Sequence, residues 1–460
     1  MTLPSSFIVP SATRWGWLLL SACLYMLLGY ATLREQFPMM IGLYALLMWG
    51  YSLRIRPLLH LADDQTAAPD RFLIGSAVIF RLLLLLALPA FSDDYARFIW
   101  DGRLLLQGIN PFRYLPVELM AGGVAPAAHV DPALYQRLNS PNYHTVYPPA
   151  NQLFFTLAAW VAPTHVLGSV VALRLPILLA DIGTLWLMMK LLVRHKRNPN
   201  LAFLYALNPL IILELTGNVH FEAVMIFFTL LAVYFWQTHK QVLSAVALAL
   251  AVTTKLLPLI ALPLVISHAG WRPGLRYSLL VLSLVGVLFV PFLDLSLLLN
   301  MLESIDLYFR KFEFNASIYY LIREGGFWLA GYNILGRVGL WLSLLTTAGL
   351  LSIAFARRFP IQVRMLWMLT LYLAMATTVH PWYLTSLVAA AVFALSSTFA
   401  IRYMLVWSGL IWLSYSAYRT NPVQEDALLL LIEYGLVAML FVIDTRHYLT
   451  NRPTHAQTPA

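Results

Sequence analysis

The sequence has few charged residues and a single cysteine. Only 11% of its 460 residues are Asp, Glu, Lys or Arg, whereas soluble globular proteins have about 25%. Hydrophobic residues make up 60% of the chain, and the mean hydropathy is +0.73. This composition excludes a soluble protein. Cys23 lies within the first apolar run, so an intrachain disulfide and a cysteine-based metal cluster are also excluded.

Long apolar runs predict an all-α, polytopic membrane protein. A helix needs about 20 apolar residues to cross roughly 30 Å of hydrocarbon, and the runs predict about 13–14 transmembrane helices. Residues 15–31 are expected to form an uncleaved first helix, because no small-residue cleavage site follows them. The expected spans lie near residues 15–32, 37–55, 71–91, 166–193, 200–216, 219–238, 241–254, 256–268, 274–292, 333–356, 361–379, 383–400, 402–418 and 427–445.

Basic residues cluster in the short segments between apolar runs, as the positive-inside rule predicts. The formal net charge of +9 therefore indicates membrane orientation and not nucleic-acid binding. Placing these clusters in the cytoplasm puts both termini there and puts residues 92–150 and 293–332 outside. Residues 151–160 are too short for a span and are expected to lie at the membrane interface. We expect one integral domain, 1–460, in the cytoplasmic (inner) membrane, with an active site facing the outside or periplasm.

The outer loop 92–150 begins with two adjacent acids, Asp93 and Asp94, at the exit of a span. On a helix beginning at Asp93, Arg97 lies one turn away and Asp101 lies on the face of Asp94, so the basic residue can hold a carboxylate ionised. Helix capping is the alternative explanation, but one aspartate would suffice for it. The acid pair is therefore a candidate catalytic group.

Other polar residues lie at the outer ends of predicted spans, where they are expensive to bury and are candidates for function. Snorkelling to the interface remains an alternative for the lysine, and a satisfied interfacial histidine remains one for each histidine. Their spacing does not support a zinc site. Deeper in the spans, Asp181 and Glu433 are interpreted as structural hydrogen-bond partners. The outer candidates are Arg97, Asp101, Arg103, Tyr147, Asn218, His220, Glu222, Lys255, Arg310, Asn315, His380 and Tyr383.

An ordered set of motifs over about residues 92–384 resembles the bacterial GT-C glycosyltransferases that use polyprenyl-phosphate sugars, including mycobacterial-type α-mannosyltransferases. In many of these relatives the large outer loop follows the first span, whereas here it follows the third. The resemblance leaves the two additional N-terminal helices without a role. The matching segments are residues 92–103, 108–112, 145–150, 208–209, 214, 217–222, 255–258, 312–317 and 380–384.

The resemblance implies an enzyme that moves a sugar, with mannose expected, from a polyprenyl-phosphate donor to a glycan or lipid-linked hydroxyl on the non-cytoplasmic face. It also implies that an aspartate of the first outer loop is the base, carried here by Asp93 or Asp94, of which we favour Asp93. Chemistry supports this, because a carboxylate can accept the acceptor's proton and cations such as Lys255 and Arg310 can stabilise the departing phosphate. We predict a single displacement with inversion. No cofactor is required, although a divalent metal is possible.

Two other functions remain open. A transporter or flippase for polyprenyl-linked sugars would place charged residues along a path near the bilayer midplane, whereas the candidates here gather near one face. A ligase-like enzyme with a diphosphate-linked donor would need further cations, for which Arg310, Lys311 and Arg323 of the second outer loop are available. The sequence does not choose the acceptor.

Overall fold

The computed structural model describes residues 11–122, 130, 132–294, 296–297, 299–300, 312–420 and 422–451. All regular elements in these residues are helical, and a single isolated bridge joins Phe314 to Thr378. The all-α prediction is confirmed. The longer helices are α1 (Ser11–Tyr30), α2 (Phe37–His60), α3 (Arg71–Leu83), α4 (Asp94–Leu106), α7 (Pro149–Val161), α8 (Val166–Arg194), α11 (Glu222–Gln237), α12 (Gln241–Thr254), α14 (Trp271–Phe289), α16 (Ile318–Ala330), α17 (Leu335–Phe355), α18 (Ile361–Met375), α19 (Leu384–Ala394) and α21 (Ala427–Asn451).

Shorter elements connect these helices and lie mostly near the ends of predicted spans. They are α5 (Pro116–Ala121), α6 (Pro132–Tyr135), η3 (Pro199–Ala202), α9 (Phe203–Ala206), α10 (Pro209–Ile211), η4 (Ile212–Gly217), η5 (Leu257–Ile260), α13 (Ala261–Ala269), η6 (Val290–Phe292), η7 (Pro381–Tyr383), α20 (Arg402–Leu410) and η8 (Ile411–Arg419).

The chain is a polytopic membrane protein. Within the described residues, four helical stretches are long and apolar enough to cross a bilayer, and a bent pair of shorter helices can form a fifth span. The four stretches are Val166–Arg194, Trp271–Phe292, Val338–Phe355 and Ala427–Asn451. Several predicted spans are shorter apolar helices, so the number of 13–14 spans stays a prediction.

The predicted span 200–216 is broken in the structure, because the chain bends by 56° between Pro199–Ala206 and Pro209–Gly217. Proline has no backbone N–H and disfavours a helical conformation in the residue before it. Asn208 accordingly leaves the helix and caps the next one, accepting a 3.0 Å hydrogen bond from the backbone N–H of Leu210. The second piece continues as a π-helix that carries Glu214, a geometry that is frequent at functional sites.

Two other predicted spans also differ from the structure. The predicted span 71–91 is helical only to Leu83, and the following irregular backbone is held by a basic residue on α8: the Arg174 guanidinium donates to the carbonyls of Leu85, Thr216 and Gly217. The predicted span 402–418 tightens into a 3₁₀ helix at Ile411. Both departures place irregular backbone where the outer elements begin.

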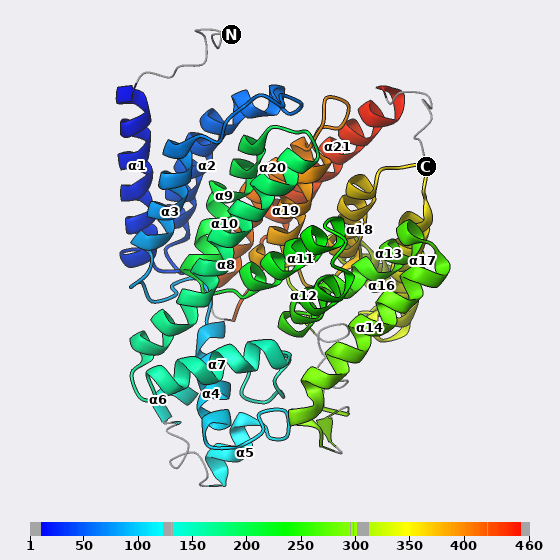
Figure 1. Ribbon diagram of the computed structural model, residues 1–460. Helices are drawn as coiled ribbons and strands as arrows, with labels where there is room; N and C mark the ends of the chain where they lie inside the picture. The colour runs from blue at the N-terminus through cyan, green and yellow to red at the C-terminus, as the bar shows by residue number, and fades with distance from the viewer. Residues whose placement is uncertain are drawn as a thin grey trace.

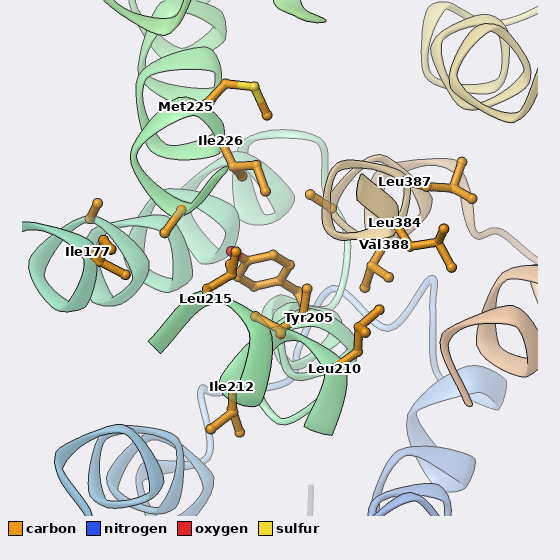
Figure 2. Close-up of a cluster of buried hydrophobic side chains, with 14 of the residues drawn as sticks. Ile177, Tyr205, Leu210, Ile212, Leu215, Met225, Ile226, Leu384, Leu387 and Val388 are labelled. Carbon is orange, nitrogen blue, oxygen red and sulfur yellow. The ribbon is translucent and has the colours of Figure 1, made fainter. Parts of the chain in front are cut away.

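The broken segment lies in the hydrophobic core. Figure 2 shows the ring of Tyr205 from α9 among Leu215 of η4, Ile226 of α11 and Val388 of α19. All four residues are buried. The segment is therefore surrounded by helices on several sides, which allows its backbone to be irregular at membrane depth.

The outer loop forms a helical layer at one end of the bundle, where α4, α5, α6 and α7 lie together (Figure 1). Helix α7 packs closely on α4, because the backbone of Phe155 occupies the space beside Gly102. The opposite face of α7 exposes Leu153, Leu157 and Trp160, as expected for a helix at a membrane interface. This layer fixes the position of α4, which carries the acid pair.

Candidate functional site

Asp93 and Asp94 occupy the first positions of α4 and have different surroundings. Asp93 stands at the N-cap position, but its side chain makes no capping hydrogen bond. It accepts a 3.0 Å hydrogen bond from Nη1 of Arg34, in the turn between α1 and α2. Helix capping therefore does not explain this aspartate, and the two N-terminal helices contribute directly to the site.

The Asp94 side chain points into a polar cluster and remains 20% exposed. Asn139 donates a 3.0 Å hydrogen bond to Oδ1, and Nε2 of His220 lies 3.9 Å from Oδ2. Burial raises the pKa of Asp94, against the opposing effects of the Asn139 hydrogen bond and the charge of Lys255. Asp94 is thus partly accessible and more basic than an ordinary aspartate.

Tyr147 belongs to the same cluster. A hydrogen bond from its side chain acts to lower the pKa of Asp94. Its ring packs edge-on against Phe98 of α4, with ring centroids 4.8 Å apart. The end of the outer loop is thereby brought back to the start of α4, and the predicted role of Tyr147 in substrate binding stays a prediction.

His220 is held by hydrogen bonds on both ring nitrogens. Nδ1 lies 3.0 Å from the carbonyl oxygen of Glu214, so it carries the proton. Nε2 lies 3.2 Å from the hydroxyl of Ser92, which donates to it. The preceding residue, Val219, has a φ of +63°, which is unfavourable for a β-branched residue. Such strain is typical of functional sites, and here it turns His220 toward α4.

Asn218 connects this turn to the end of the third predicted span. Its Nδ2 donates a 2.9 Å hydrogen bond to Glu214, and its Oδ1 accepts from the backbone N–H of Phe91 at 3.4 Å. Glu214 is fully buried and also accepts a 3.0 Å hydrogen bond from the hydroxyl of Tyr415. This network fixes the backbone immediately before the acid pair.

Lys255 lies at the hinge between α12 and η5, as the sequence predicted. Its Nζ forms an ion pair with the buried carboxylate of Glu222 and lies 4.6 Å from the ring centroid of Tyr383. The lysine side chain is 36% exposed. Its positive charge therefore faces the cluster, held between a carboxylate and an aromatic ring, and acts electrostatically on Asp94.

Two aromatic contacts join the motif at 380–384 to two other motifs, and a third lies within it. The Trp382 ring stacks on His220 with centroids 4.0 Å apart and on His380 with centroids 4.3 Å apart. His380 in turn stacks on Phe314, at 4.8 Å. Burial and the nearby Lys255 lower the pKa of His380 to about 3. We call the stacked rings of Phe314, His380, Trp382 and His220 the aromatic column. His380 is therefore uncharged near neutral pH.

Three candidates on α4 lie within the outer layer. Asp101 is fully buried and accepts hydrogen bonds from Arg97 at 2.8 Å and from the hydroxyl of Thr145 at 2.5 Å. Arg97 also donates to the carbonyl oxygens of Ser140 and Tyr143. Arg103 is buried on the same helix. The contacts of Arg97 and Asp101 tie the loop to α4, so a direct role in substrate binding stays a prediction for these residues.

Asn315 lies on the side of the cluster that faces α21. Its backbone has a φ of +47°, its N–H donates to Glu425 at 2.5 Å, and its Nδ2 donates to Glu433 at 3.2 Å. Phe314 belongs to the aromatic column, whereas Asn315 points away from it. Arg310 and Lys311 lie outside the described residues, so their predicted role toward the phosphate stays a prediction.

The motif at residues 108–112 joins the two outer segments. Asn110 donates a 3.1 Å hydrogen bond to the carbonyl of Phe292, and Asn300 donates a 2.9 Å bond to the carbonyl of Phe112. The tight turn before them uses Gly108 at a φ of +74°. The structure thus gives this motif a role in docking the outer segments.

Several residues of the site were missed by sequence reasoning. Arg34 was missed because no motif surrounds it. Ser92 and Trp382 lie within the matching motifs, directly before the candidates Asp93 and Tyr383, but were not themselves predicted as site residues. Asn139 has no recognisable signal.

The interpretation of Asp181 as a structural partner agrees with its buried ion pair with Arg81 at 2.5 Å and its hydrogen bond from Tyr205.

The arrangement provides a partly exposed carboxylate, a neutral histidine and a lysine on one side of the molecule. Such a set can accept a proton and stabilise an anionic leaving group. Within the described part of the chain, no group of three or more His, Cys, Asp or Glu side chains is arranged to hold a metal ion. The side chains present can supply general base catalysis and electrostatic stabilisation.

Comparisons with known proteins find similarity to mannopyranosyltransferases. Alpha-(1->6)-mannopyranosyltransferase A of Mycobacterium tuberculosis is 24% identical over 276 residues, which cover 58% of this chain and 49% of that protein. Alpha-(1->6)-mannopyranosyltransferase B of Corynebacterium glutamicum is 27% identical over 148 residues, which cover 32% and 24%, respectively. The matches thus span half or less of the relatives' own length.

A family match covers more than half of the chain. Residues 2–270 match the family described as "Alpha-(1->6)-mannopyranosyltransferase, N-terminal domain". The matched region contains Arg34, the acid pair, His220 and Lys255. The chain therefore belongs to the alpha-(1->6)-mannopyranosyltransferase family.

Proposed function

We propose that this protein is a membrane-embedded mannosyltransferase that uses a polyprenyl-phosphate mannose donor and glycosylates a hydroxyl of a glycan or lipid-linked acceptor. Family membership supports the sugar and the reaction type. The active site faces the outside of the cytoplasmic membrane, in keeping with the charge distribution of the sequence. The observation that carries the proposal is Asp94, a partly exposed carboxylate at the start of α4 within a cluster of motif residues.

Asp94 is the general base in this proposal. The family resemblance favoured Asp93, but that carboxylate is paired with Arg34, whereas Asp94 faces Asn139, His220 and Lys255. The acceptor hydroxyl gives its proton to Asp94 while its oxygen forms a bond to the anomeric carbon. The bond from that carbon to the phosphate oxygen breaks, and the phosphate leaves with the electron pair.

Lys255 supplies positive charge for the departing phosphate. The leaving group gains negative charge in the transition state, so a cation fixed in a partly buried position lowers the barrier. The Glu222 ion pair and the Tyr383 ring hold the lysine in place. Direct displacement by the acceptor predicts inversion at the anomeric carbon, which NMR of the glycosylated product measures.

The decisive experiment is transfer of radiolabelled sugar from a panel of donors by purified protein in detergent or vesicles. The panel contains polyprenyl-phosphate mannose, polyprenyl-phosphate glucose and a polyprenyl-diphosphate sugar. We expect transfer from the first donor, a loss of more than about 100-fold in Asp94→Asn, and measurable transfer in Asp93→Asn. Asp64→Asn is the matched control, because Asp64 is a partly exposed acid on the opposite predicted side that contacts Thr66.

Other results would exclude parts of the proposal. Normal transfer by Asp94→Asn would exclude this residue as the base. Transfer from the diphosphate donor alone would favour the ligase-like enzyme. Movement of an intact polyprenyl-linked sugar across vesicles, with no transfer from any donor, would favour the flippase.

A further inference from the structure

Arg34 joins the two N-terminal helices to the acid pair. It lies in the turn between α1 and α2, and its Nη1 donates to Oδ2 of Asp93 at 3.0 Å. Its guanidinium lies 4.2 Å from the ring centroid of Tyr418 in η8. The arginine side chain is 19% exposed, against 45% for Asp93. An arginine held by both a carboxylate and an aromatic face has little freedom to move.

The ion pair between Arg34 and Asp93 reduces the repulsion between the two adjacent aspartates. Two adjacent carboxylates repel each other, and a negative neighbour raises the pKa of a carboxyl group. An uncompensated negative charge on Asp93 would therefore hinder ionisation of Asp94. The guanidinium of Arg34 offsets the charge of one member of the pair.

We propose that Arg34 is a positioning residue whose guanidinium offsets the negative charge of Asp93, so that this charge does not oppose the action of Asp94 as the base. This inference rests on the proposed function, in which Asp94 is the base. The two aspartates then have separate tasks: Asp93 anchors the first hairpin to the start of α4, and Asp94 accepts the proton.

The charged and titratable groups described around the pair come from several elements. Asp93 faces Arg34 and Tyr418, whereas Asp94 faces groups from the outer loop, α11 and the α12–η5 hinge. Arg34 also acts on Tyr418, as do both aspartates, so the four groups share one electrostatic environment. The groups that face Asp94 are Tyr147, His220, Glu222 and Lys255.

The inference makes opposite predictions for the two partners of the ion pair. In Arg34→Gln, the uncompensated charge of Asp93 raises the pKa of Asp94, so the acid limb of kcat/KM moves to higher pH, by roughly half a pH unit or more. In Asp93→Asn, the unpaired guanidinium lowers the pKa of Asp94, so the acid limb moves to lower pH. In the double variant the two effects cancel, and the limb returns toward its wild-type position.

A purely structural role for Arg34 would not give shifts of opposite sign. Arg34→Lys keeps the charge and is expected to restore most of the wild-type profile, which separates charge from shape. Arg14→Gln is the matched control: Arg14 lies at the other end of α1 and also pairs with an aspartate, Asp70, and contacts a ring, that of Phe72. Its variant should leave the acid limb in place.

The experiment is the pH dependence of kcat/KM for mannose transfer by the full-length protein. Shifts of opposite sign in the single variants, cancelling in the double variant, would support the inference. An unchanged acid limb in Arg34→Gln, or shifts of the same sign, would overturn it. If Arg34→Gln does not fold, the direction of the Asp93→Asn shift decides alone. Loss of transfer in Asp94→Asn with no shift in the Arg34 variants would leave the proposed function standing.

Discussion

Nε2 of His220 lies 3.9 Å from Oδ2 of Asp94. The two residues belong to different motifs, and the outer layer, α8 and the broken segment separate them in the sequence. Their approach depends on the strained turn at Val219 and on the hydrogen bond from Ser92, which fixes the imidazole. The histidine donates through Nδ1 to a backbone carbonyl, so the nitrogen that faces the acid pair is an acceptor.

Mannose transfer should decline as the pH falls through the pKa of Asp94. A general base must be ionised, and burial raises the pKa of this carboxyl above the ordinary value of about 3.9. The acid limb of kcat/KM should therefore lie above about pH 4. His380, whose pKa is about 3, stays neutral in this range. Rates measured between pH 4 and 8 test this; a limb near pH 6.5 that vanishes in His380→Gln would contradict it.

Replacement of Lys255 by glutamine should lower kcat more than it changes KM. The lysine stabilises charge that develops on the phosphate in the transition state, so its loss is expected to cost about 100-fold in kcat. Lys190→Gln is the matched control, because Lys190 on α8 also lies over an aromatic ring, the indole of Trp186, at 4.1 Å from its centroid. Steady-state kinetics with polyprenyl-phosphate mannose measure the effect. A change in KM alone would mean that Lys255 contributes only uniform binding.

Replacement of Trp382 by alanine should destabilise the protein and disturb the site together. The indole is buried between His220 and His380, and truncation of a buried tryptophan costs about 3–5 kcal/mol of unfolding free energy. Trp382→Phe keeps a stacking ring and should retain most of the stability. Thermal unfolding in detergent measures both variants. Trp186→Ala, at a tryptophan that is 52% exposed, should change stability little.

Replacement of Gly102 by alanine should displace the helix that carries the acid pair. A Cβ at this position would lie 2.1 Å from the carbonyl oxygen of Phe155, so α4 and α7 would have to separate. We expect a marked fall in melting temperature together with loss of transfer. Gly42→Ala in α2 is the matched control, because a Cβ there has no neighbour within 4 Å and alanine favours the helix by about 1 kcal/mol. Equal behaviour of the two variants would contradict the proposed close packing.

Sequence patterns indicated which residues are candidates for the centre of the site, but not how these residues are arranged. Polar groups beside apolar runs are expensive in a membrane. The positions of Asp94, His220, Glu222 and Lys255 beside such runs therefore made them recognisable as candidates. The sequence could not separate Asp93 from Asp94, because adjacent residues share a motif and differ only in the neighbours that the fold supplies. Arg34 was not recognisable at all, since no motif surrounds it and only tertiary packing brings it to its partner, Asp93.

The backbone breaks show the same limit. Hydropathy predicted a span at residues 200–216, because most residues there are apolar. The Asn208-Pro209 pair ends one helix and caps the next, and the π-helix that follows carries Glu214 into the core. Irregular backbone at this depth is stable only where other helices surround it and satisfy its polar groups, as Arg174 does for Thr216 and Gly217.

The sequence by itself determined that the protein is helical and lies in a membrane, because apolar runs of this length have no other stable environment in which every backbone polar group is paired. It also determined which side chains are candidates for chemistry. Only the tertiary structure decided which of them meet: it paired Asp93 with Arg34, left Asp94 facing His220 and Lys255, and assigned Arg97 and Asp101 to holding the outer layer. The reason is that contacts between distant segments depend on packing and backbone breaks, which local patterns do not record.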